Sequence, residues 1–294
     1  MIRDLLLRRC AFELAGARNA GEIGLCRGNV WTLTEQMRLL MVGDVVGSAG
    51  RKVVKKLLPE LRRELEIDFV TLQGENLAGG FGLTLETAHE MLEAGADVIT
   101  TGNHVWDKKE FVGHLDDPGL PVLRPLNYPP SNPGRGAVDT GAVAVVNLIG
   151  RVWVGEFDSP FAAIDDLLAG GWGTGRPVLV DFHAEATSEK VAMGWHLDGR
   201  VAAVAGTHTH VATADLRILS GGTAYVSDLG MVGAMDSVIG MQTEGALERF
   251  LTGVNQRFKP AESGPMRFNS VLIETDDQTK RAVNIERVDR EIEL

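Results

Sequence analysis

The chain has 294 residues, of which 44% are hydrophobic and 23% are charged, so its length and composition suit one ordered α/β domain. Its formal net charge of −11 would repel phosphate backbones, which argues against general nucleic-acid binding. A small phosphorylated substrate stays open, because bound metal ions can invert the sign of the local field.

The first 36 residues read as an N-terminal extension. Their leucine run, residues 5–7, is too short for a signal peptide, and no apolar run in the chain approaches the roughly 20 residues that span a bilayer. Met37 directly precedes the first convincing strand. We therefore expect a poorly ordered extension over residues 1–36 and a single domain over residues 37–294. Both cysteines lie in the extension, which favours a cytoplasmic protein with no membrane partner.

The first half of the domain alternates short apolar runs with amphipathic segments. The sequence predicts strands at residues 39–42, 68–72 and 97–101, and helices at residues 53–65 and 85–92. Such a βαβαβ series favours a parallel sheet with right-handed crossovers.

The second half is richer in hairpins. Strands are expected at residues 142–147, 151–156, 177–182, 201–205, 223–226, 267–274 and 282–288, with one helix at residues 187–195. A mixed α/β sandwich of two sheets with outer helices fits this order better than one doubly wound sheet. No linker or repeat divides the chain.

Polar side chains follow five of these strands, usually after a glycine. They are Asp44, Glu75, Asn76, Asn103, His104, His183, His208 and His210. Ligands of α/β sheets bind beyond the carboxyl ends of the strands, so all five groups can meet at one edge. A glycine before the polar group lets the backbone turn sharply and approach a ligand closely.

The residue types at these strand ends are those of a metal centre. Carboxylate and amide oxygens combined with imidazole suit manganese, iron, zinc or cobalt, and seven such groups are enough for two ions that share a carboxylate. His208 and His210 are expected in an extended segment, where positions i and i+2 point the same way. Two metals about 3.5–4 Å apart can generate a hydroxide and stabilise an in-line displacement at phosphorus.

Each strand end also has a structural interpretation, as a helix cap, a polar turn or a buried histidine. Gly43, Gly47 and Gly50 could instead form a dinucleotide-binding turn, although their spacing is G-x-x-x-G-x-x-G and not G-x-G-x-x-G. That alternative leaves the histidines unexplained. The recurrence of ligand types at five strand ends favours the metal centre.

Taken in order, the motifs resemble the calcineurin-like metallophosphoesterase superfamily, whose pattern is Asp-x-His, Gly-Asp, Gly-Asn-His, a single His and Gly-His-x-His. Here Val45-Val46 follows Asp44, Glu75 replaces an aspartate, and the last motif reads Gly-Thr-His-Thr-His. These departures are those of the YmdB-like bacterial phosphodiesterases. Further matches to that group lie at residues 43–47, 74–76, 101–107 and 181–190, and the resemblance runs from Met37 nearly to the C-terminus.

The resemblance implies an α/β/β/α sandwich with two metal ions, divalent or mixed-valence and usually iron or manganese. One ion would be held by Asp44, Glu75, Asn76 and His210, and the other by Glu75, Asn103, His183 and His208. His104 would be the general acid that protonates the leaving oxygen. The implied substrates are 2′,3′-cyclic nucleotides, opened by attack of a metal-bound hydroxide, and homo-oligomers are common in the group.

Two other kinds of function stay open from the sequence. The chain could be a regulatory binding protein that keeps the metal site and acts through a partner. It could also be a phosphomonoesterase or a nuclease that uses the same site, although the negative net charge argues against long nucleic acids.

Overall fold

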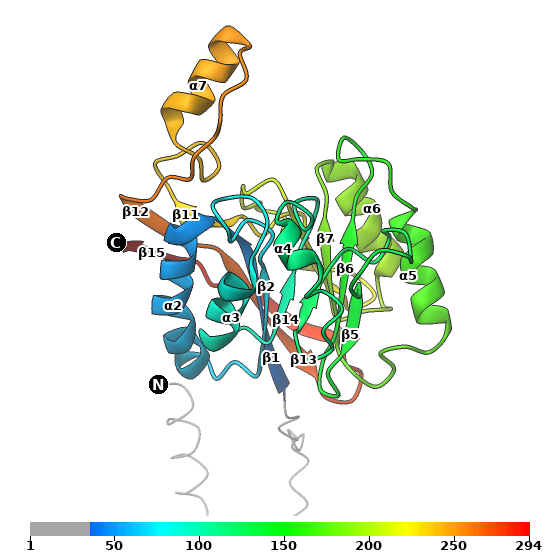
Figure 1. Cartoon of the computed structure of the whole chain (residues 1–294). Coiled ribbons are helices and arrows are strands. Elements are labelled where there is room, and N and C mark those ends of the chain that lie inside the picture. Colours follow the sequence, from blue (N-terminus) through cyan, green and yellow to red (C-terminus); the bar gives the residue numbers. More distant parts are fainter. Residues whose placement is uncertain (1–35) are drawn as a thin grey trace, which may run out of the picture. The chain divides into compact units, whose positions relative to one another are not determined.

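The computed structural model describes residues 36–294 (Figure 1). The predicted N-terminal extension lies outside the described residues except for Gln36, which already belongs to the first strand. Residues 36–294 all belong to one compact unit. Within residues 36–294 we find no helix whose length and apolarity would let it traverse a bilayer. The expected single domain over residues 37–294 stays a prediction.

The first of two sheets has nine strands. Its parallel part has the order β11-β1-β2-β3-β4, and antiparallel strands complete it at the β11 side. The strands are β1 (Gln36–Val45), β2 (Phe69–Gln73), β3 (Val98–Thr100), β4 (Val122–Leu123), β11 (Met231–Ala234), β12 (Pro265–Phe268), β13 (Ser270–Asp276), β14 (Ala282–Arg287) and β15 (Arg290–Glu293).

The second sheet has six strands in the order β5-β6-β7-β8-β10-β9. Its four central strands run parallel, and the two edge strands run antiparallel to them. They are β5 (Ala137–Asp139), β6 (Ala144–Ile149), β7 (Val178–His183), β8 (Ala203–Thr207), β9 (Arg217–Ile218) and β10 (Ala224–Val226). Both sheets are therefore mixed.

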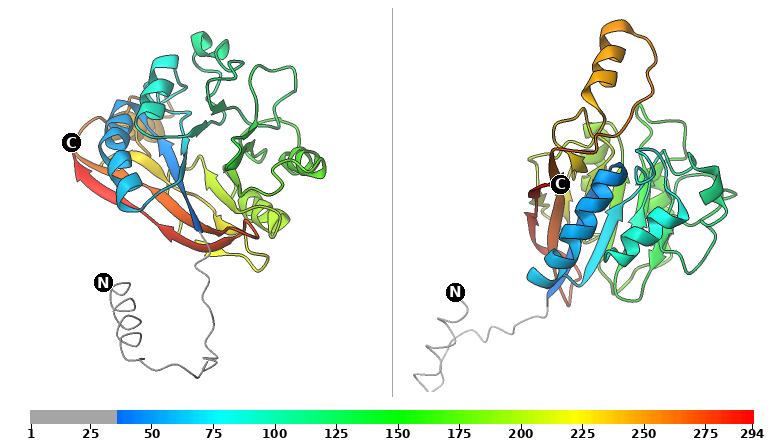
Figure 2. Two further views of the ribbon diagram at one scale, coloured as in Figure 1. Left: turned by 90° about the horizontal axis from the view of Figure 1, so that it is seen from below. Right: turned by 60° about the vertical axis from the view of Figure 1, so that its left-hand side comes forward.

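The two sheets pack face to face, and helices cover the outer face of each (Figures 1 and 2). In β1, Leu39 and Met41 contact the second sheet, whereas Leu40 and Val42 pack under α2 (Gly47–Glu64) and α3 (Leu85–Glu93). This alternation is the period of two that a strand between two apolar layers requires. On the far side, α5 (Pro160–Ala169) and α6 (Thr187–Leu197) cover the six-stranded sheet. The predicted α/β/β/α sandwich is confirmed.

Two of the strand predictions are wrong. Residues 151–156 form turns, because the carboxylate of Glu189 in α6 accepts hydrogen bonds from the backbone amides of Arg151 (3.0 Å) and Val152 (3.2 Å). Trp153 next to them has a φ of 62°, which no strand permits. The expected strand at residues 267–274 is broken at Asn269, whose carbonyl accepts a hydrogen bond from the amide of Gly43 (3.1 Å).

A helical arm projects from the nine-stranded sheet and was not predicted. We call residues 238–260 the α7 arm; it contains α7 (Thr243–Thr252) and extends away from the sandwich in Figure 1 and in the right-hand view of Figure 2. Isolated bridges from Met241 to Val238 and to Pro260 close its base. Ala246 is the buried residue of α7, whereas Phe250 and Leu251 are 81% and 82% exposed.

Candidate metal centre

The predicted ligands come from strand ends of both sheets. Those with oxygen donors follow or end strands of the nine-stranded sheet: Asp44 in β1, Glu75 and Asn76 after β2, and Asn103 after β3. Those with imidazole donors belong to the six-stranded sheet: His183 ends β7, and His208 and His210 follow β8. The site is therefore assembled where the two sheets face each other.

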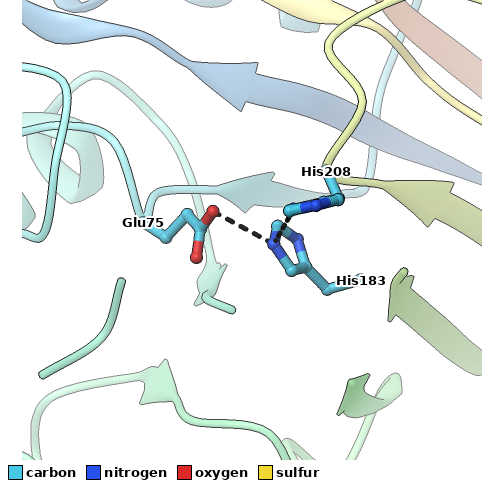
Figure 3. A group of neighbouring side chains, drawn as sticks. All are labelled: Glu75, His183 and His208. Carbon is cyan, nitrogen blue, oxygen red and sulfur yellow. Dashed lines mark hydrogen bonds and ion pairs between the residues drawn. The ribbon is translucent and has the colours of Figure 1, made fainter. Parts of the chain in front are cut away.

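His183 is the centre of one group of ligands. Its Nε2 atom lies 3.0 Å from Oε1 of Glu75, 3.0 Å from Nδ1 of His208 and 3.1 Å from Oδ1 of Asn103. Figure 3 shows Glu75 and His208 both facing the His183 ring. One donor atom from each of Glu75, His183 and His208 lies within 4.8 Å of the others, a spacing at which a single ion can be held.

Asp44 and Asn76 form the second group with His210. Oδ1 of Asp44 lies 3.8 Å from Nε2 of His210 and 4.0 Å from Nδ1 of His183. This oxygen and Oδ1 of Asn76 are buried and accept no hydrogen bond. A buried oxygen without a donor costs free energy unless another positive group compensates it, so both atoms fit a metal cation. Asn76 lines the same cavity as Glu75, His208 and His210.

The loop that carries His208 and His210 is not extended, so that expectation is wrong. Their φ angles are 97° and 65°, in a region that side chains other than glycine rarely adopt. Strained backbone of this kind persists only where the surroundings fix it, and it is frequent at functional sites. The backbone amide of His208 donates a hydrogen bond to Oδ2 of Asp44 (3.2 Å), which ties the loop to the opposite sheet.

A buried ion pair also holds this loop in place, and it was not predicted from the sequence. Asp228 accepts hydrogen bonds from the amide (3.2 Å) and the hydroxyl (2.8 Å) of Thr209, the residue between the two histidines. The ammonium of Lys190 lies 2.7 Å from the same carboxylate oxygen, and both side chains are almost fully buried. Lys190 ends the motif at residues 181–190, which was the available signal.

A chain of hydrogen bonds orients His183. The Thr207 hydroxyl donates to Asp181 (2.6 Å), and both this hydroxyl and the side-chain amide nitrogen of Gln73 lie 3.0 Å from Nδ1 of His183. The other oxygen of Asp181 accepts from the Thr100 hydroxyl in the opposite sheet (2.5 Å). With Nδ1 used in this way, Nε2 is free to act as a ligand, which is how histidines at metal sites are usually fixed.

His210 is oriented in the same manner. Its Nδ1 atom lies 2.8 Å from the carbonyl oxygen of Ile239, which belongs to the base of the α7 arm. This contact leaves Nε2 facing Asp44.

The buried charges shift the protonation of these groups. Burial raises the pKa of Asp44 to about 6, although His210 and His183 oppose the shift. Burial also disfavours the charged form of Glu75, but His183 beside it outweighs that effect and lowers the pKa of the carboxyl to about 2. The same pair raises the pKa of His183 to about 9 against the effect of burial. Glu75 is thus a buried carboxylate whose negative charge is stabilised by the adjacent His183.

Gly102 shows how tightly the ligands are packed. A Cβ atom at this position would overlap both the His183 ring and the carboxylate of Glu75. The glycine before Asn103 is therefore required by close approach of the ligands, as the sequence suggested.

His104 is placed beside the ligands and faces the cavity. Its backbone amide donates a hydrogen bond to Oε2 of Glu75 (2.9 Å), and its Nδ1 lies 2.9 Å from Oδ2 of Asp107. The ring packs edge-on against Phe81, with centroids 5.0 Å apart. With Asp107 at Nδ1, the other ring nitrogen can present a proton to a ligand in the cavity.

Comparisons with known proteins agree with this geometry. The sequence model of the YmdB-like protein family matches residues 40–288. The chain is 48% identical over 257 residues to a 2′,3′-cyclic-nucleotide 2′-phosphodiesterase of Bacillus subtilis, covering 86% of this chain and 96% of the relative. A crystal structure of a hypothetical protein from Thermus thermophilus matches with 42% identity and a TM-score of 0.81, over 87% of this chain and 99% of that one. A novel phosphatase from Mycoplasma pneumoniae matches with 33% identity and a TM-score of 0.82, over 89% of this chain and 95% of that one.

Proposed function

This chain belongs to the YmdB-like protein family, and from that premise we propose that it is a metal-dependent phosphodiesterase that opens the ring of 2′,3′-cyclic nucleotides. The observation that carries the proposal is the convergence of carboxylate, amide and imidazole donors from five strand ends on one group of contacting side chains, some of which line a cavity. The relative from Bacillus subtilis, named for that reaction, supports the substrate class.

We propose that the site holds two ions, iron or manganese, in two overlapping ligand sets. Asp44, Glu75, Asn76 and His210 would hold one ion, and Glu75, Asn103, His183 and His208 would hold the other. The contacts around His183 and Asp44 support these two sets. When bound, the metal pair would activate water and neutralise the charge that develops on the phosphate.

His104 is proposed as the general acid. Hydrolysis adds one water to the cyclic phosphate and breaks one P–O bond, so a nucleoside monophosphate is formed and the released ribose oxygen takes up a proton. His104 would donate that proton, since Asp107 holds its ring in place and Phe81 packs against it beside the cavity. If the bond to the 2′ oxygen breaks, the product is the 3′-monophosphate.

A substrate panel on protein loaded with manganese or iron tests the proposal. We expect cyclic nucleotides to be converted to monophosphates faster than phosphomonoesters or long RNA are cleaved, as followed by phosphorus NMR. The same measurement distinguishes the phosphomonoesterase and nuclease alternatives. If fully loaded protein left every phosphodiester intact, the proposed function would be wrong.

We also propose that the chain forms a homo-oligomer through the exposed apolar side of the α7 arm. Leu247, Leu251 and Val254 are 54%, 82% and 57% exposed, and apolar groups clustered on a projecting segment commonly mark an interface. A second copy of the chain is the proposed partner. Sedimentation analysis should show dissociation for Leu251→Glu; an unchanged sedimentation coefficient would contradict this interface. The cytoplasmic location stays a prediction from the sequence.

A further inference from the structure

The cavity at the metal centre is wider than the chemistry at phosphorus requires. It has a volume of about 530 Å³, which is within the range of about 300–1,000 Å³ that small-molecule sites usually occupy. One side is formed by the metal-centre residues and His104. Another part of the lining, which we call the outer wall, is formed by Phe81 and by Arg249, Phe250 and Phe258 of the α7 arm.

The outer wall is mainly aromatic. Phe81 belongs to the loop after β2 and contacts His104 edge-on, so it lies next to the proposed general acid. Phe250 lies within α7, and Phe258 lies in the segment of the arm that follows the helix. Aromatic faces at this position can stack on a planar ring that extends from the reacting phosphate.

A single cation accompanies these aromatic rings. Among the described residues that line the cavity, Arg249 is the one lysine or arginine, whereas Glu75 and Glu185 contribute carboxylates. The guanidinium carbon of Arg249 lies 5.2 Å from the centroid of the Phe258 ring, a contact that holds the charge in place on the ring. A cyclic phosphate ester is an anion, and a nucleobase is a flat π system, so an arginine beside phenylalanines matches both.

We propose that the outer wall is the nucleoside subsite: the base stacks on Phe258 and Phe81, and Arg249 binds the nucleotide by charge and stacking. This inference rests on the proposed function and extends it to the part of the substrate that does not react. Because every nucleobase has a π face, such a subsite binds all four bases with little discrimination. It also gives the α7 arm a role that is separate from self-association.

The geometry of α7 separates the two roles. Residues 246, 249 and 250 line the cavity, and at 100° per residue they share one side of the helix. Leu247 and Leu251 lie on a different side, about 100° away, and are exposed. Substitutions at Arg249 or Phe258 therefore test the subsite without removing the apolar side.

The test compares a nucleotide with the same reacting group lacking a base. Phe258→Ala and Arg249→Gln would each be assayed, with metal loaded, on 2′,3′-cyclic AMP and on 1-O-methylribose 2,3-cyclic phosphate. We expect KM for the nucleotide to rise about 5- to 100-fold in both variants, since that is the range that loss of one stacking contact produces. The kcat/KM for the abasic ester should change less than about twofold in Phe258→Ala. In Arg249→Gln it should fall less than kcat/KM for the nucleotide falls, because the abasic ester loses only the charge contribution of the arginine. The same rise is expected for the guanosine, cytidine and uridine substrates.

Arg257→Gln is the matched control, because it removes one exposed positive charge from the same arm at a residue that does not line the cavity. It should leave KM for the nucleotide unchanged. Equal losses on the nucleotide and the abasic ester, or an equal effect of Arg257→Gln, would overturn the subsite and assign the arm a structural or general electrostatic role.

Equilibrium binding of adenosine 3′-monophosphate separates failure of the subsite from failure of the proposed function. If the loaded protein hydrolyses no phosphodiester yet binds this nucleotide, and Phe258→Ala weakens binding at least fivefold, the subsite stands and the reaction is wrong. If turnover is normal and neither variant changes binding, the reaction stands and the subsite is wrong.

Discussion

The metal centre and the α7 arm both line one cavity, yet they are built differently. Asp44, Glu75 and His183 are at most 1% exposed, and each is fixed by contacts from both sheets. The arm has one buried residue in its helix, and its base is closed by bridges from Met241 to Val238 and to Pro260. Bond formation to metals tolerates errors of a few tenths of an ångström, whereas stacking on a base tolerates far more, so the two regions need different degrees of order.

Because of this difference, substitutions in the two regions should have separable consequences. Changes at the metal centre are expected to alter metal content or kcat, and changes in the arm are expected to alter KM for nucleotides. Four experiments test whether the two regions have these separate roles, beginning with the variant that should affect the metal centre most.

The largest effect is expected for Glu75→Gln, which removes the proposed bridging charge while keeping the shape of the side chain. Metal content should fall below two ions per chain, and turnover should fall at least about a thousandfold, because the paired ions provide most of the charge stabilisation. Elemental analysis and steady-state kinetics measure both. Glu248→Gln, at an exposed position of α7, is the control. Full metal content with normal turnover in Glu75→Gln would refute the ligand assignment.

His104→Ala should separate chemistry from metal binding. Loss of a general acid typically lowers kcat about 10²- to 10⁴-fold, while both ions should remain bound, since the donor to Glu75 is the backbone amide at this position. His114→Ala is a matched control outside the cavity. A variant that lost its metals along with its activity would show that His104 acts structurally.

Lys190→Met tests the ion pair beneath the histidine loop. Asp228 would be left as an unpaired buried charge, which typically costs about 3–5 kcal/mol of unfolding free energy. Metal affinity should fall about 10- to 100-fold, because Asp228, which holds Thr209, is no longer fixed by Lys190. Chemical denaturation and metal titration measure the two effects. The exposed pair of Lys55 with Glu90 provides the comparison: Lys55→Met should change stability by about 1 kcal/mol or less. Equal effects of the two substitutions would remove any special role for Lys190.

The smallest effect on the metal centre is expected when the arm is shortened. Replacing residues 242–259 by a short glycine linker is geometrically feasible, because Met241 and Pro260 form a bridge at the base of the arm. Metal content and turnover of the abasic ester should stay within about twofold of the full-length chain, since Ala246 is the one buried residue of α7 that is lost. A deleted chain that failed to bind metal would show that the arm stabilises the site.

Much of the metal centre could be predicted from the sequence because its ligands follow apolar strands. Asp44 lies at the carboxyl end of β1, Glu75 and Asn103 follow shortly after β2 and β3, and parallel strands bring their carboxyl ends together. The left-handed backbone at His208 and His210 could not be predicted, because it depends on Asp44 and Asp228, which are distant in the chain. The turns at residues 151–156 were missed for the same reason, since Glu189 of α6 determines them.

The arm escaped prediction for a different reason. Residues 243–252 show a short amphipathic pattern, but a helix with a single buried residue leaves little periodic signal in a sequence. A role for Arg249 and Phe258 can be inferred only from the structure, because it depends on the cavity that they line together with several of the proposed ligands.

The division of donor types between the sheets affects which element the protein selects. Among the proposed ligands, those of the nine-stranded sheet are hard oxygen donors, which alone would suit magnesium or calcium, and those of the six-stranded sheet are nitrogen donors. Preference for a transition metal therefore depends on how the two halves are aligned, and not on either half. Mutations in the interface between the sheets, far from any ligand, should be able to change which ion is retained after purification.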